Sequence, residues 1–185
     1  MVGQILQRTG LRRLATLPRN DYSKVRVQAM PGASGRALVV TDGFAPGERA
    51  LSFVAPLGGE KTMHSLQVGR DLHTQTADHE LWIFMNHSCR PNCRLELLAL
   101  DESGPAPHAH VGVVALAGLR AGDVVTFDYN TTEWEMATPF TCDCATQTPC
   151  VVAGASKLSA EQRSRWSGRW RHIDDLLAAR ERGAA

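Results

Sequence analysis

The sequence has no long run of apolar residues, and among its 185 residues it has only 2 tyrosines, 5 cysteines and a net charge of +1. A membrane-spanning helix needs about 20 consecutive apolar residues, so we expect no membrane anchor. The near balance of charges gives no broad basic surface, and we expect no direct binding to nucleic acid. An odd number of cysteines argues against a closed disulfide framework. This length suits one domain with a substantial core and short extensions.

The first 20 residues carry four arginines and no acidic residue. Their hydrophobic residues recur at roughly helical intervals, as in a mitochondrial presequence, although threonine stands where such segments usually have serine. A frayed basic terminus is an equally good interpretation. No apolar segment typical of a secretory signal is present. We therefore expect an intracellular protein, and mitochondrion, cytoplasm and nucleus all stay open.

Short hydrophobic segments separated by glycine-containing turns dominate the first two thirds of the sequence. They predict strands over 24–28, 36–40, 49–54, 65–68, 93–100, 111–116 and 123–127. Asp78 has the character of a helix cap, and a short helix after it would bury Leu81, Trp82 and Met85. This pattern favours a mainly β (α+β) fold of small sheets folded on one another.

The character of the sequence changes after Cys150, where two helices are expected. Ser159 and Gln162 have the spacing of a capping box, and this first helix would reach about Trp166. A second helix would place four apolar residues on one face: Trp170, Ile173, Leu176 and Leu177. We interpret that face as packing against the domain, with a partner-binding helix as the alternative.

The densest group of reactive side chains lies between Asn86 and Cys93, directly after an apolar segment. Two amides, an imidazole, a hydroxyl and two thiols surround one proline there. Phe127-Asp128-Tyr129-Asn130 is a second polar group that follows an expected strand. Taken alone, Tyr129 and His87 are more often structural residues than catalytic ones.

Cys142, Cys144 and Cys150 would supply three metal ligands from one short loop. Zinc in a structural site takes four ligands, and a full set of protein ligands would leave no position for water. Four residues are candidates for the fourth ligand: Cys89, Cys93, His108 and His110. Ordinary thiols without a metal are the alternative interpretation.

Together these segments resemble the SET-domain lysine methyltransferases over residues 24–158. The resemblance rests on Asn86-His87-Ser88-Cys89-x-Pro91-Asn92, on Gly122-Asp123-x-x-Thr126-Phe127-Asp128-Tyr129 and on Gly35-Arg36-Ala37-Leu38. Phe140-x-Cys142-x-Cys144-x5-Cys150 is similar to the post-SET zinc loop of the family.

The resemblance implies a β-clip fold, in which small sheets surround a knot-like crossing of two segments, with C-terminal helices added. It divides the chain into a basic extension (1–22), a SET domain (23–131), a post-SET zinc loop (132–158) and a helical tail (159–185). The implied activity is protein-lysine N-methylation with S-adenosylmethionine. The implied partner is a protein that presents a lysine, and we expect the enzyme to be a monomer.

The resemblance also implies a role for individual residues. Tyr129 would be the catalytic residue and would also contact the cofactor. Other cofactor-binding residues would be Gly35, Arg36, Ala37, Asn86, His87 and Phe140. Trp134 is a candidate for the lysine channel or for covering adenine, with core packing as an equal alternative. Structural zinc would be held by Cys89, Cys142, Cys144 and Cys150.

Three features depart from the family pattern. Ala37 replaces the second glycine of Gly-x-Gly, the last zinc spacer runs from Ala145 to Pro149, one residue longer than usual, and no cysteine-rich pre-SET segment is present. Ala37 and the missing pre-SET segment favour the alternative function, a catalytically inactive SET-like domain that is stabilised by zinc and binds other proteins.

Overall fold

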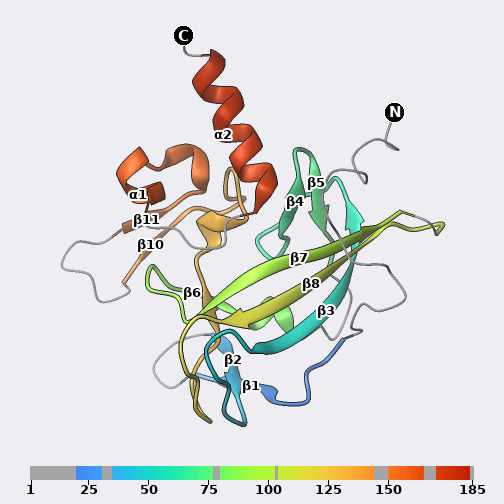
Figure 1. Ribbon diagram of the computed structural model, residues 1–185, viewed down its shortest axis with the longest axis vertical. Coiled ribbons are helices and arrows are strands. Elements are labelled where there is room, and N and C mark those ends of the chain that lie inside the picture. Colours follow the sequence, from blue (N-terminus) through green and yellow to red (C-terminus); the bar gives the residue numbers. More distant parts are fainter. Residues whose placement is uncertain are drawn as a thin grey trace.

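The computed structural model describes residues 20–30, 35–76, 80–102, 104–143, 150–164 and 170–183 (Figure 1). The strands are β1 (Val25–Ala29), β2 (Arg36–Val40), β3 (Arg49–Gly58), β4 (Gln67–Gly69), β5 (Leu72–Thr74), β6 (Asn86–His87), β7 (Cys93–Asp101), β8 (His108–Ala115), β9 (Thr126–Phe127), β10 (Phe140–Cys142) and β11 (Cys150–Val152). The helices are α1 (Ala160–Ser164) and α2 (Arg171–Gly183), and 3-10 turns form at η3 (Trp82–Phe84), η4 (Tyr129–Thr131) and η5 (Ala155–Lys157). The expectation of a mainly β fold of small sheets with C-terminal helices is confirmed.

A five-stranded antiparallel sheet, in the order β4-β5-β3-β8-β7, forms the body of the molecule. Figure 1 shows the long strands β3, β7 and β8 crossing the middle of the molecule, with the smaller sheets around them. Phe53 in β3 is fully buried and stacks on Trp82, with 4.9 Å between the ring centroids. The main core therefore joins this sheet to the turn η3, which precedes the polar segment Asn86–Cys93.

The small sheet of β1 and β2 supports the chain that leads to Tyr129. Val27 lies opposite Leu38 in its antiparallel register. The free edge of β2 receives the later segment, because Val125 N–H donates to the Leu38 carbonyl at 2.8 Å. Leu38 and Val125 are both fully buried. This contact at the edge of the sheet sets the position of the residues that follow Val125, including Tyr129.

Two segments far apart in the sequence cross beside this sheet. β6 and β9 pair in parallel, with Asn86 opposite Thr126 and His87 opposite Phe127. The side chain of Asn92 holds the crossing together, because its Oδ1 accepts hydrogen bonds from the Thr126 N–H at 2.9 Å and the Thr126 hydroxyl at 3.0 Å. This is the knot-like crossing expected from the resemblance.

The expected helix after Asp78 is wrong in its described part. Asp78 lies outside the described residues, and the chain forms only the single 3-10 turn η3 before Met85 becomes extended, with φ −69° and ψ 128°. The extended conformation is required because the next residue, Asn86, already pairs with β9. Trp82 and Met85 are nevertheless buried, as predicted.

The strand expected over 123–127 is shortened to β9, and the short strand β5 was not predicted. The capping box of α1 is confirmed: Ser159 N–H donates to Gln162 Oε1 at 2.8 Å, and Gln162 N–H donates to Ser159 Oγ at 3.2 Å. The N-terminal segment proposed as a presequence and the helix end near Trp166 lie outside the described residues.

The C-terminal helix packs on the domain through its predicted face. Ile173 and Leu177 are buried together with Ala155, and the side chain of Trp134 packs against this group. Trp170 joins the main core, and its indole N–H donates to the Leu95 carbonyl at 3.3 Å. None of the helices in the described part of the chain has the length and apolar character needed to cross a membrane.

Candidate active site and thiol cluster

A cavity of about 530 Å³ opens beside the crossing of β6 and β9. Its volume lies within the range of small-molecule sites. The wall combines aromatic and apolar side chains with a few polar ones. It includes Gly35, Arg36, Thr62, Met63, His64, Ser65, Leu66, Trp82, Ile83, Phe84, Met85, Asn86, Phe127, Tyr129, Thr132, Glu133, Met136, Ala137, Thr138 and Phe140.

Tyr129 begins the turn η4 directly after β9, and its side chain reaches back across the crossing. Its hydroxyl donates a hydrogen bond of 2.7 Å to the carbonyl of Met85. Asp128 fixes the turn, because its side chain accepts from the Asn130 N–H at 3.0 Å. Burial raises the pKa of Tyr129 to about 12, so the hydroxyl is neutral at physiological pH. Its oxygen therefore keeps acceptor capacity while its proton is engaged.

His87 lies under Tyr129, and its side chain is only 3% exposed. The Tyr129 N–H donates to Nδ1 at 3.2 Å, which assigns the ring lone pair to Nδ1. Nε2 faces the sulfur of Cys89 at 3.2 Å. Burial lowers the pKa of His87, although the carboxylate of Asp128, 3.8 Å from Nδ1, acts in the opposite direction. The imidazole is thus a neutral link between the cavity wall and the thiols.

The segment proposed as Gly-x-Gly meets the cavity with two of its three residues. Gly35 and Arg36 line the wall, and the guanidinium of Arg36 lies over the Phe84 ring at 4.4 Å from its centroid. Ala37 is fully buried in β2 and is not among the lining residues. Asn86 lines the wall from β6. Ala37 is therefore not part of the cavity wall.

Phe140 and Trp134 have different surroundings, although both were expected at the cofactor. Phe140 lines the cavity, is 36% exposed, and approaches His87 and Tyr129 edge-on at 5.7 Å and 6.1 Å between ring centroids. Trp134 does not line the cavity; it packs against the group of Ala155, Ile173 and Leu177. These contacts are those of core packing, the alternative considered beside the lysine channel and the covering of adenine.

Glu133 is a buried cavity residue that was not among the predicted site residues. It is only 5% exposed and lines the wall near Tyr129. Its Oε1 accepts hydrogen bonds from the Gln67 N–H at 2.9 Å and the Thr132 hydroxyl at 3.2 Å. Burial raises the pKa of Glu133 to about 7, against the lowering effect of these hydrogen bonds. The one sequence signal for it is an acidic residue four positions after the tyrosine.

The thiols gather on the far side of His87. Cys142 and Cys150 lie opposite each other in the β10–β11 pair, and the sulfurs of Cys89 and Cys150 are 2.7 Å apart. His87, Cys89 and Cys142 place one potential ligand atom each within 4.8 Å of one another. Cys144 lies outside the described residues.

This donor set suits zinc, which favours thiolate and imidazole ligands. The edge of a tetrahedral zinc–sulfur site is about 3.8 Å for Zn–S bonds of about 2.3 Å, so the sulfurs of Cys89 and Cys150 would separate by about 1 Å around an ion. Cys93 is buried at the start of β7, where burial raises its pKa to about 12. The group of potential ligand atoms formed by His87, Cys89 and Cys142 does not include Cys93, and we leave it out of the metal set.

The structure thus brings Tyr129, Asn86 and His87 together, as the resemblance implied. It adds Gly35, Arg36 and Phe140 to the same cavity wall. It leaves Ala37 and Trp134 outside that wall.

Comparison with known proteins agrees with this arrangement. Residues 15–130 match the family described as SET domain. The protein named methyltransferase flvH from Aspergillus flavus is 31% identical over 154 residues, which span 80% of this chain and 76% of that protein. A protein from Arabidopsis thaliana, named histone-lysine N-methyltransferase ATXR3, is 39% identical over 44 residues, which are 24% of this chain and 2% of that protein.

Proposed function

The chain belongs to the SET-domain family, and on that premise we propose that it is a methyltransferase that transfers a methyl group from S-adenosylmethionine to the side-chain nitrogen of a lysine in a protein substrate. A relative that matches most of the chain is named a methyltransferase, and one that matches a short part is named a histone-lysine N-methyltransferase. The observation that carries the proposal is Tyr129, whose hydroxyl is fixed at the crossing and whose side chain lines the cavity.

The cavity wall fits S-adenosylmethionine in its chemistry. Arg36 offers a guanidinium for a carboxylate, and guanidinium–carboxylate pairs are strong and directional. Phe84, Phe140 and Tyr129 offer aromatic rings, which attract a positively charged sulfur. When bound, the cofactor would supply a methyl group activated by that charge.

Tyr129 would direct the substrate nitrogen. Because its proton is donated to the Met85 carbonyl, its oxygen can accept an N–H from an amine. This fixes the direction of the nitrogen lone pair, and such positioning can account for most of the barrier reduction in a transfer between two bound groups. The apolar part of the wall excludes water, which favours the neutral form of the amine.

The thiols would stabilise the wall without taking part in the chemistry. Cys89, Cys142, Cys144 and Cys150 would hold a structural zinc ion, as the resemblance implies. The Nε2 of His87 would then donate to the Cys89 thiolate, which is a common arrangement around metal ligands. Zinc binding would fix β10 and, with it, the position of Phe140.

One of the two features that favoured the inactive interaction module, Ala37, is buried in β2 and is not among the residues that line the cavity. We therefore retain the enzyme as the proposed function.

Replacement of Tyr129 tests the proposal. In Tyr129→Phe we expect S-adenosylmethionine to bind with nearly parental affinity by calorimetry. Methyl transfer from labelled cofactor to proteins of a cell extract should fall by a factor on the order of 10² to 10³, as for loss of one fixed polar group at a reacting centre.

Tyr22→Phe is the matched control, because it removes the other tyrosine hydroxyl of the chain, which donates to Glu80 at 2.8 Å. Parental transfer by Tyr129→Phe would refute the assigned role. An absence of cofactor binding by the parent protein would refute the enzyme itself.

A further inference from the structure

A buried carboxyl group lies one helical turn beyond Tyr129 on the cavity wall. The Glu133 N–H donates to the Tyr129 carbonyl at 3.1 Å, so the two residues close one turn of helix. Residues four apart in such a turn lie on the same side. Both side chains line the cavity. An amine held at the Tyr129 hydroxyl would therefore approach Glu133 from within the same space.

The hydrogen bonds of Glu133 leave half of its carboxylate for the cavity. Both of the hydrogen bonds it accepts end at Oε1, from the Gln67 N–H and the Thr132 hydroxyl. Within the described part of the chain, no hydrogen bond or ion pair reaches Oε2. The nearest influence of opposite charge comes from Lys61, which instead donates to the Glu135 carbonyl at 3.2 Å.

A buried carboxylate without a cation is unfavourable, which is why burial raises the pKa of Glu133, and a positively charged ligand in the cavity would stabilise its ionised form. The ligand must enter through the cavity, whose other ionisable side chains are Arg36, His64 and Tyr129. None of these is placed to neutralise Glu133 by an ion pair in the described residues. An alkylammonium group, narrow and positively charged at its end, has the required chemistry.

Resting on the proposed function, we infer that Glu133 binds the ammonium group of the substrate and accepts one of its protons before methyl transfer. The N–H bond breaks, the proton moves to Oε2, and the electron pair stays on the nitrogen. That pair is then available for attack on the methyl carbon. The carboxyl group returns its proton to solvent after the product leaves.

The electrostatics of Glu133 suit both steps. A carboxyl whose pKa is raised to about 7 by burial exchanges a proton readily near neutral pH. A bound ammonium group stabilises the carboxylate, and the proton would move to it once the apolar wall and the positive charge of the bound cofactor have lowered the pKa of the amine. Either a lysine side chain on a protein or a small free amine would present this group.

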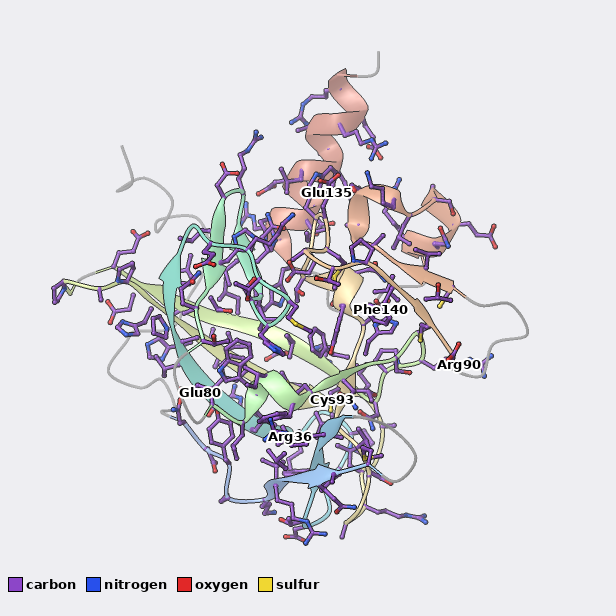
Figure 2. All side chains as sticks on the ribbon, turned by 180° about the vertical axis from the view of Figure 1, so that it is seen from behind. Arg36, Glu80, Arg90, Cys93, Glu135 and Phe140 are labelled. Atoms are coloured by element: carbon purple, nitrogen blue, oxygen red, sulfur yellow. The ribbon has the colours of Figure 1, made fainter. Side chains whose placement is uncertain are left out.

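The test compares Glu133→Gln with Glu135→Gln. The first variant keeps an Oε1 acceptor for the Gln67 and Thr132 donors but removes the negative charge. Glu135 is exposed and does not line the cavity, and Figure 2 shows it beside the C-terminal helices at the end of the molecule away from Arg36. The probes are n-butylamine and n-butanol, which share a chain and differ in charge.

The parent protein and Glu135→Gln should bind n-butylamine at least about tenfold more tightly than n-butanol, as expected for a hydrogen bond between charged groups. Glu133→Gln should lose this preference while it retains calorimetric binding of S-adenosylmethionine. The same preference in Glu133→Gln as in the parent would overturn the inference. An absence of cofactor binding by the parent would overturn the proposed function first, so the two failures are distinguishable.

Transfer of labelled methyl groups provides the second measurement, on a lysine peptide and on n-butylamine. With either acceptor, kcat/KM of the parent should rise with pH through about pH 7. In Glu133→Gln this rise should be absent, and the rate of transfer should be at least about tenfold lower. Labelling of the peptide alone identifies a protein substrate, and labelling of n-butylamine identifies a small amine. An unchanged pH limb in Glu133→Gln with either acceptor would contradict the proton transfer.

Glu133→Asp covers the case in which the glutamine variant fails to fold. It keeps the charge but withdraws it by one methylene, so the preference for n-butylamine should persist and transfer should fall. Loss of the preference in Glu133→Asp, with cofactor binding intact, would count against charge recognition by this residue.

Discussion

The sheet region (residues 20–131) and the C-terminal cap (residues 132–183) are stabilised in different ways. The sheet region has strands of up to 10 residues and one large core, in which Phe53, Leu38 and Val113 are fully buried. The cap has strands of only three residues and a small group of buried residues around Ile173. A sheet of two three-residue strands is not stable by itself, so the cap depends on its thiols and on the contacts of α2.

The cavity lies where these two regions meet. The sheet region contributes Arg36, Asn86 and Tyr129, while the cap contributes Glu133 and Phe140. Tyr129 is therefore held by the better stabilised region, and Phe140 by the weaker one. This difference in stabilisation predicts that a change in the cap will alter ligand binding while the sheet region stays folded.

Removal of metal should give the largest difference between the two regions, because it should affect the cap and leave the sheet region almost unchanged. A chelator, or Cys89→Ala, should release one zinc ion per chain and expose the amides of β10 and β11 to hydrogen exchange, because metal binding and folding of such a loop are coupled. S-adenosylmethionine affinity should fall at least about tenfold, within the range found when support around a metal is lost. Exchange in β3 and β8 should change little.

Cys93→Ala is the matched control, since the proposal places Cys93 outside the metal set. Its zinc content should stay at the parental value, measured by mass spectrometry of the purified protein. A zinc-free parent, or equal zinc in Cys89→Ala and the parent, would contradict the assigned metal site.

Truncation of one buried side chain in each region tests whether the cap and the sheet region unfold separately. Ile173 and Leu95 are both buried, the first in the cap and the second in the main core. Each change to alanine removes similar volume, and such changes destabilise by about 2–5 kcal/mol. Ile173→Ala should lie near the lower end, because the small group around it can relax, and should speed exchange only in the cap. Leu95→Ala should lower the midpoint of global unfolding. Equal exchange profiles would show that the two regions unfold as one unit.

The sequence predicted the parts of the molecule that depend on local pattern. Most strands could be predicted from the alternation of apolar and polar residues and from the turn residues between them. The capping box of α1 could be predicted from the spacing of Ser159 and Gln162. Tyr129, Asn86 and His87 came together because two motifs, with His87 and Tyr129 42 positions apart, share the crossing of β6 and β9.

What the sequence did not predict depends on contacts between distant residues. Glu133 is buried because the Gln67 N–H, 66 residues earlier, points at its carboxylate. Trp134 packs against Ile173, and β10, β11, η5 and α1 lie between these two residues in the sequence. Ala37 is separated from the cavity because adjacent residues of a strand face opposite sides. The contacts of Glu133 and Trp134 have no periodic signature in the sequence.

Acid should weaken the packing of α2 on the domain, with a smaller effect on stability than the changes to alanine. His172 Nε2–H donates to the Thr132 carbonyl at 3.1 Å, and burial lowers the pKa of His172 to about 4. Since the folded pKa lies below the ordinary value of about 6.5, this histidine contributes stability that is present above pH 6.5 and is lost as pH falls toward 4.

Burial also lowers the pKa of His73, which acts in the same direction, while the raised pKa of Glu133 acts in the opposite one. The contribution of His172 therefore needs a difference between two proteins. Between pH 7 and 5, His172→Gln should lose less stability than the parent, by about 1–2 kcal/mol in denaturant unfolding. His64→Gln, which changes an exposed histidine, should follow the parent. Parallel curves for His172→Gln and the parent would place the acid sensitivity of the cap in another group.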